Sequence, residues 1–179
     1  MCRECRLRQI KKVSELYNIG DKIVYPMHGA GVIEAIEEKV VLGQKQSYYI
    51  MKMTLTGEMT VMIPMNNCEE IGVRFVIDKE EGAKVLEEFR KAPINENANW
   101  NKRHRENMQK IKTGDIYQVL NVVKELMYRD KSKGLSTSER KMLNNAKQIM
   151  VSELVLSAVA DKNDIESIMT DTVDELFEA

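Results

Sequence analysis

The spacing of hydrophobic residues changes once along the chain, near residue 78. Before this point apolar and polar residues alternate over short runs, as in residues 47–54, where Tyr49, Met51 and Met53 share one face. After it, apolar residues recur every three or four positions, which is the period of an α-helix. The pattern predicts an α+β fold with a small β module at residues 16–72 and an all-α helical domain at residues 73–179.

The β module is predicted to contain four or five short strands. Four of them lie at residues 22–25, 32–42, 47–54 and 59–63. Gly29 and Gly31 predict a tight bend between the first two strands, and Pro64 stops the last. Short strands at such close spacing favour a small β barrel, in which no strand edge is left exposed.

The helical domain is predicted to begin with three helices. The first covers residues 79–91 and ends before Pro93, and the second covers residues 100–112. The third follows Asp115, which caps it, and ends at Gly134. A single apolar stripe runs along this third helix, formed by Ile116, Val119, Leu120, Val123, Leu126 and Met127.

Two further helices complete the prediction. Ser136 and Glu139 stand three residues apart just before an apolar run, which is the spacing of a capping box at a helix start. Asp164 is the predicted N-cap of the last helix.

The net charge of −1 conceals two regions of opposite charge. Residues 100–150 contain 12 Lys/Arg and 5 Asp/Glu, a net charge of +7, whereas residues 151–179 contain 1 Lys and 8 Asp/Glu, a net charge of −7. This asymmetry indicates a local surface for a polyanion rather than a basic protein.

Metal binding and catalysis have little support. Cys2 and Cys5 form one C-x-x-C pair, but a structural zinc site needs four ligands, and Cys68, His28 and His104 are scattered singly. No phosphate-binding glycine motif or catalytic cluster is present. We therefore expect no cofactor, no metal, no small-molecule substrate and no enzymatic activity, although an enzyme with an unrecognised site remains the least supported alternative.

The expected location is the cytoplasm. No apolar run reaches the roughly 18 residues that a membrane-spanning helix needs. Residues 1–15 are basic but are not followed by the apolar stretch of a secretory signal, and three cysteines make no disulfide framework.

Residues 99–112 carry the strongest functional signal. Trp100, the only tryptophan, is followed at once by Lys102, Arg103 and Arg105 in a polar stretch. An aromatic ring beside cations suits nucleic-acid contact, because the cations meet phosphates while the ring stacks on or wedges beside a base. The alternative, that Trp100 packs a helix start against the core and the cations are ordinary surface, stays open on these residues alone.

A second basic group surrounds the helix that starts after Ser136. Its cations would add to the attraction of the helix N-terminus for phosphate, although on these residues alone a solvated surface is the favoured explanation. The group consists of Lys131, Lys133, Arg140 and Lys141.

Several segments resemble one known family in the same order along the chain. Residues 17–26 (YNIGDKIVYP) and 28–31 (HGAG) resemble the opening of CarD/CdnL proteins, and of the related module in transcription-repair coupling factors. The second half is similar to the helical domain of CarD at Asn99-Trp100, Gly114-Asp115, Arg129-Asp130, Gly134-Leu135-Ser136, Glu139 and Met142-Leu143. The coupling factors continue into helicase motifs that this chain lacks.

The resemblance implies a bacterial transcription regulator. Its first module would be a Tudor-like barrel that binds the RNA polymerase β subunit. Its helical domain would contact promoter DNA at the upstream edge of the transcription bubble, without reading a defined sequence. There the residue matched by Trp100 enters the minor groove and stabilises the open promoter complex.

The resemblance also points to particular residues. Trp100, Lys102, Arg105 and Arg140 match DNA-contacting or basic positions of the family, and the basic clusters add Arg103 and Lys141 to the predicted DNA-binding set. For the polymerase contact, Lys39 matches a basic position, whereas a second basic position of that surface falls on Met62. A stand-alone, non-specific DNA-binding module without a polymerase partner is the alternative.

The basic tail at residues 1–15 departs from the family, whose members usually start near the position of Leu16. We hypothesise that Leu16 is a misread TTG start codon, in which case Cys2 and Cys5 are absent from the natural protein. Mass spectrometry of the native N-terminus tests this, and a peptide containing Cys5 would refute it.

Overall fold

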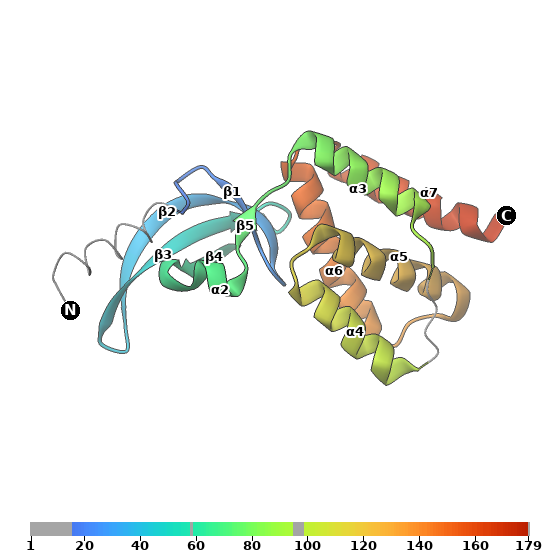
Figure 1. The fold of residues 1–179 in the computed structure, drawn as a ribbon, viewed down its shortest axis with the longest axis horizontal. Coiled ribbons are helices and arrows are strands. Elements are labelled where there is room, and N and C mark those ends of the chain that lie inside the picture. The colour runs from blue at the N-terminus through green and yellow to red at the C-terminus, as the bar shows by residue number, and fades with distance from the viewer. Residues whose placement is uncertain (1–15, 58, 95–98, 179) are drawn as a thin grey trace.

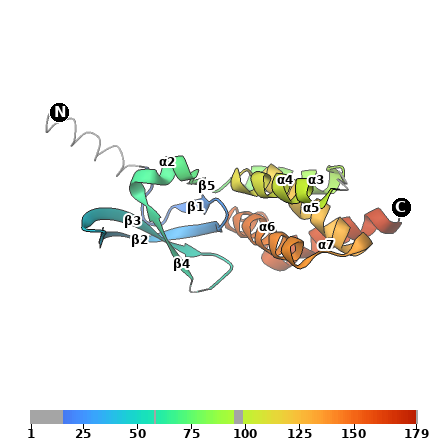
Figure 2. The same ribbon diagram turned by 90° about the horizontal axis from the view of Figure 1, so that it is seen from below.

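The computed structural model describes residues 16–57, 59–94 and 99–178. The predicted tail, with Cys2 and Cys5, lies outside the described residues. A β sheet and a bundle of helices lie side by side along the long axis of the molecule (Figures 1 and 2). The predicted α+β fold, with a small Tudor-like β module preceding the helices, is confirmed.

Among the described residues, five antiparallel strands form the sheet in the order β4-β3-β2-β1-β5. They are β1 (Lys22–Tyr25), β2 (Gly29–Val41), β3 (Gln44–Met53), β4 (Thr60–Pro64) and β5 (Arg74–Phe75). The predicted inward face of the third strand is confirmed, since Tyr49, Met51 and Met53 are all buried. β5 lies beyond residue 72, where the sequence pattern placed the end of the β module.

The sheet does not close on itself. Among the described strands, β4 and β5 stand at its two ends and no ladder joins them, which differs from the predicted barrel without free edges. A 3-10 turn (Met65–Asn67) and the short helix α2 (Cys68–Ile71) connect these two strands. Met65 and Cys68 are buried in the sheet's core, so this segment completes the core where strand pairing stops.

Gly29 and Gly31 do not form the bend that their spacing predicts. The turn lies at residues 26–28, and both glycines belong to β2. A Cβ on Gly31 would lie 2.3 Å from the Lys52 carbonyl oxygen, and one on Gly29 would lie 2.8 Å from Ser152 Oγ. The two glycines therefore allow close packing, Gly31 against β3 and Gly29 against a helix.

In the part of the chain that the structure describes, five long helices follow the sheet: α3 (Lys79–Lys91), α4 (Trp100–Lys112), α5 (Ile116–Lys133), α6 (Thr137–Leu156) and α7 (Lys162–Glu178). The predicted cap at Asp115 and the Ser136–Glu139 capping box are confirmed. The predicted cap at Asp164 is wrong. Asp161 fills that role by accepting a hydrogen bond from the Asp164 backbone N–H at 2.9 Å, so Asp164 lies in the first turn.

A lysine lies inside the helical core. Lys124 on α5 is 1% exposed, and its Nζ donates to the carbonyl oxygens of Arg90 and Ala92 at 3.0 and 2.6 Å. Burial lowers the pKa of Lys124. These bonds satisfy carbonyls at the end of α3, which a helix cannot satisfy by itself, and so tie this end to α5.

Polar contacts join the sheet to the helices. The Arg74 guanidinium donates to Glu153 Oε2 and to the Gly114 carbonyl oxygen, both at 2.8 Å. The Ala30 backbone N–H donates to Ser152 Oγ at 2.9 Å. These contacts of Arg74 and Ala30 with the helical domain are termed the seam below. Because the Glu153 side chain is almost completely buried, the seam holds the two modules in a defined relative orientation.

Candidate functional site

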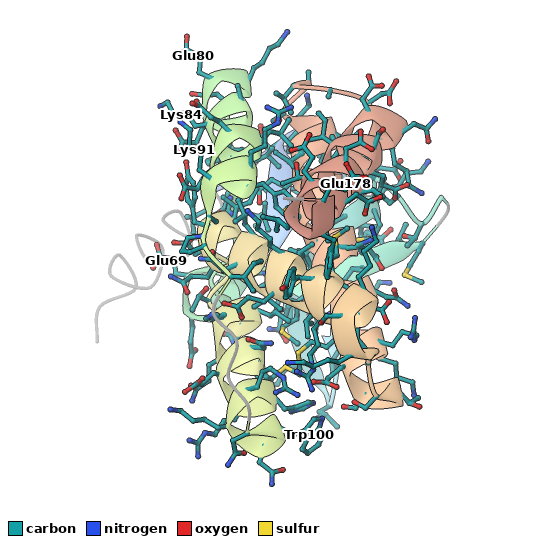
Figure 3. The ribbon with its side chains drawn as sticks, turned by 90° about the vertical axis from the view of Figure 1, so that its right-hand side faces the viewer. Glu69, Glu80, Lys84, Lys91, Trp100 and Glu178 are labelled. Atoms are coloured by element: carbon teal, nitrogen blue, oxygen red, sulfur yellow. The ribbon has the colours of Figure 1, made fainter. Side chains whose placement is uncertain are left out.

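Trp100 is the first residue of α4, at the end of that helix far from the sheet. The other end of α4 leads to Gly114, whose carbonyl oxygen accepts a hydrogen bond from Arg74 in the seam. A helix of 13 residues is roughly 20 Å long at 1.5 Å per residue. Trp100 is 43% exposed, and its side chain projects from the lower end of the bundle in Figure 3. The alternative of a core-packed Trp100 therefore does not hold.

Two elements supply exposed cations around this end of the domain. On α4, Lys102 and Arg105 are exposed and stand three residues apart, so they share a face. At the start of α6, Arg140 and Lys141 are exposed, although Arg140 donates to Asp130 at 3.0 Å. These four residues and Trp100 are termed the basic face below.

Arg103 does not belong to the basic face. It is 6% exposed, and its Nη2 donates to Glu139 Oε1 at 2.6 Å. Helix periodicity explains this orientation, because Arg103, Asn107 and Ile111 recur every four residues on the buried side of α4. This corrects the prediction that Arg103 contacts DNA: its guanidinium joins α4 to the first turn of α6.

Glu139 connects three groups near the start of α6. It accepts from Arg103, and its other carboxylate oxygen accepts from the Ser136 backbone N–H and hydroxyl, at 3.1 and 2.8 Å. Burial alone would raise the pKa of Glu139, but the hydrogen bonds from Arg103 and Ser136 outweigh it and lower the pKa below its usual value. The carboxylate therefore stays ionised and keeps the two helix starts together.

His104 contacts Trp100, which the sequence analysis did not anticipate. The imidazole and indole centroids are 5.3 Å apart with a 31° angle between the rings. His104 Nε2 is also hydrogen-bonded to Ser138 Oγ at 3.0 Å. The available sequence signal was the four-residue spacing of Trp100 and His104, which puts both rings on one helix face. His104, Ser138 and Lys141 line an open hollow between α4 and α6.

The sheet brings together the two residues predicted to contact a protein partner. Lys39 on β2 and Met62 on β4 lie in different strands, and Lys39 Nζ is 3.1 Å from Met62 Sδ. Exposed apolar residues follow Lys39 along the chain: Val40 and Val41 are exposed on β2, and Leu42 at the hairpin tip is 99% exposed. This surface, residues 39–42 with Met62, is termed the sheet face.

Cys68, His28 and His104, the residues considered for a metal site that the structure describes, lie apart. Cys68 is buried, and burial raises the pKa of its thiol to about 11, so the reactive thiolate is suppressed. His28 stacks on Tyr25, whereas His104 contacts Trp100. Within the described ranges no group of three His, Cys, Asp or Glu side chains is arranged to hold a metal ion. Likewise, none of the helices described is long and apolar enough to cross a membrane.

Comparison with known proteins decides the family. The family model of the CarD C-terminal domain matches residues 84–170, and that of the CarD-like/TRCF RID domain matches residues 17–77. A relative in Bacillus subtilis (strain 168) named "Putative transcription factor YdeB" is 43% identical over 148 residues, which are 82% of this chain and 96% of the relative. The chain belongs to the CarD family.

The CarD assignment is consistent with the division seen in the fold. The RID match ends at residue 77, just after β5 and before α3, and the C-terminal match starts within α3. The protein is thus a CarD-type transcription regulator, as the sequence resemblance predicted.

Proposed function

We propose that this CarD protein connects RNA polymerase to promoter DNA and stabilises the open promoter complex. The sheet face binds the polymerase β subunit, and the basic face contacts DNA at the upstream edge of the bubble without sequence specificity. Trp100 enters the minor groove there. The observation that carries the proposal is an exposed tryptophan at a helix start, with cations from α4 and α6 on the same end of the domain.

The contacts of the basic face suit a role in distorted DNA. The four exposed cations can pair with phosphates, which gives attraction but no sequence information. An aromatic side chain between base steps requires those steps to be unstacked, so it stabilises the distorted duplex over the regular one. A differential contact of about 1.4 kcal/mol shifts a two-state equilibrium tenfold, which is enough for a promoter near balance.

The arrangement of the two faces fits a bridging protein. The sheet face lies towards the tip of the β2–β3 hairpin, and the basic face lies on the other side of the seam (Figure 1). Binding to polymerase through the sheet raises the effective concentration of DNA at the helices, so weak contacts there suffice. The ion pair of Arg74 with the buried Glu153 keeps the two faces in a set orientation.

Trp100→Ala tests the proposal in an open-complex lifetime assay with RNA polymerase. We expect a severalfold shorter lifetime, with unchanged co-purification with polymerase. Phe177→Ala is the matched control, since Phe177 is a 43% exposed aromatic on α7 outside the basic face, and we expect it to leave the lifetime unchanged. An unchanged lifetime for Trp100→Ala would exclude the wedge role.

The alternative is a non-specific DNA-binding module without a polymerase partner, which the exposed cations alone would also permit. Co-purification of the full chain with polymerase separates the two functions. DNA binding without polymerase association would favour the alternative, whereas association lost in Lys39→Glu would support the sheet face as the polymerase site.

A further inference from the structure

Trp100 is held on one side by a second ring. Residues four apart on a helix are neighbours on its surface, and the His104 imidazole lies beside the indole with a centroid separation of 5.3 Å. Trp100 as a whole is nevertheless 43% exposed. One part of the ring is therefore packed against protein and another is available to a partner.

The imidazole is itself anchored outside its own helix. His104 Nε2 and Ser138 Oγ are joined by a 3.0 Å hydrogen bond, and Ser138 lies in the first turn of α6. The neighbouring contact is the buried pair of Arg103 with Glu139. Consecutive residues of α4 thus contact consecutive residues of α6, so the backbone beneath the imidazole is fixed as well as its ring.

We propose that His104 is a positioning residue for Trp100. Its imidazole, anchored by Ser138, restricts the indole to the orientation in which it enters DNA. A side chain held in its bound orientation loses less conformational freedom on binding, so the same contact stabilises the complex more. The effect on transcription rests on the proposed function, whereas the restriction of the indole is a property of the protein by itself.

The restriction can be measured directly because Trp100 is the only tryptophan. Fluorescence anisotropy decay and quenching by acrylamide report on this one indole in the full chain. In His104→Ala we expect a larger fast component of the anisotropy decay and stronger quenching than in the parent protein. Ser138→Ala removes the anchor but keeps the neighbouring imidazole ring, so its effect should have the same direction and be smaller.

A conservative variant and a folding control complete this test. His104→Phe keeps an aromatic neighbour and should restore most of the restriction of the indole. Thermal unfolding followed by circular dichroism checks that each variant folds, and Ser138→Ala, at an exposed position, remains informative if His104→Ala does not. Unchanged anisotropy and quenching in both His104→Ala and Ser138→Ala would overturn the proposal.

The functional readout is the open-complex lifetime in a double-mutant cycle. His104→Ala should shorten the lifetime part of the way towards Trp100→Ala, and the double variant should equal Trp100→Ala, because His104 acts through the indole. If His104→Ala frees the indole but leaves the open-complex lifetime at its parental value, while Trp100→Ala shortens that lifetime, the positioning role is overturned. If Trp100→Ala itself has no effect, the proposed function fails, while a freed indole in His104→Ala still supports the restriction by His104.

Discussion

The basic face and the sheet face are built in different ways. Around Trp100, side chains are tied to neighbours: Arg103 to Glu139, Arg140 to Asp130, and His104 to Ser138. The sheet face presents Lys39 among exposed apolar side chains, with Leu42 almost fully exposed at a hairpin tip. The helical surface thus presents preorganised cations, which suit a polyanion, whereas the sheet surface is suited to burying apolar area against a protein.

The acidic residues at the end of the chain also lie away from the basic face. The acidic residues of the last segment lie mainly on α7, whose end at Glu178 is in the upper half of Figure 3, whereas Trp100 is at the bottom. One acid of α7, Asp174, pairs with Lys131 and so reduces the positive charge of α5. The net charge of +7 in residues 100–150 is therefore least compensated by the acids of α7 on the side of α4 and the start of α6.

The largest expected effect follows from breaking the buried pair beneath the basic face. Removing one partner of a buried ion pair costs about 3–5 kcal/mol when the other charge is left uncompensated. Because Arg129 Nε also lies 3.7 Å from Glu139 Oε1 and would remain, we expect the lower end of this range. We expect Arg103→Ala to lower the free energy of unfolding by this amount in urea titrations. Lys102→Ala, one residue away but exposed, is the control and should change it by less than about 0.5 kcal/mol. Similar small changes in both variants would contradict the structural role of Arg103.

The next effect concerns binding of DNA to the basic face. Replacing Lys102, Arg105 and Lys141 by Gln should weaken binding to duplex DNA, and the slope of log K against log salt should fall by roughly one per phosphate contact removed. Fluorescence polarisation over a salt series measures this slope. A control with Lys84, Lys91 and Lys162 changed to Gln removes the same charge from α3 and α7. Equal slopes for the two triple variants would remove the distinction between the basic face and ordinary surface.

A smaller effect is expected at the sheet face. Lys39→Glu should weaken binding to the polymerase β subunit by about 1 kcal/mol, with a shallower salt dependence than DNA binding has, because apolar contacts surround the charge. Biolayer interferometry at two salt concentrations measures both quantities. Lys84→Glu, the same change on α3, controls for net charge. Equal affinity for Lys39→Glu and the parent protein would take Lys39 out of the interface.

The smallest effect is a dependence of stability on pH. Because the pKa of Glu139 in the folded protein is lowered below its ordinary 4.5, the folded state binds the proton less tightly than the unfolded chain. The stabilisation is complete above about pH 4.5 and is lost as the pH falls through the folded-state pKa. Thermal unfolding between pH 6 and 3 measures this loss. Glu139→Gln should show a shallower acid dependence, and an unchanged dependence would rule out Glu139 as its source.

Local patterns determined most of the fold. The bounds of α3 and α4, the cap at Asp115 and the capping box at Ser136 were all predictable, because each depends on residues close together in the sequence. The position of Trp100 beside exposed cations also followed from one short segment. The last helix was less predictable, because Asp161 and Asp164 are both acceptable caps and the sequence offers no means to choose between them.

Tertiary structure alone decided which polar residues face inward and which distant residues meet. Arg103 is buried because Glu139, 36 residues later, stands opposite it, and Lys124 is buried because the end of α3 offers it two carbonyl oxygens. Nothing in the local sequence indicates such partners, since a lysine or arginine in a helix is ordinarily exposed. The same holds for the meeting of Lys39 with Met62, for the seam made by Arg74, and for the contact of Ser138 with His104. The sequence by itself determined most of the elements, the charge and the family. The pairing of distant groups decided how each candidate site is arranged, because it depends on packing between elements.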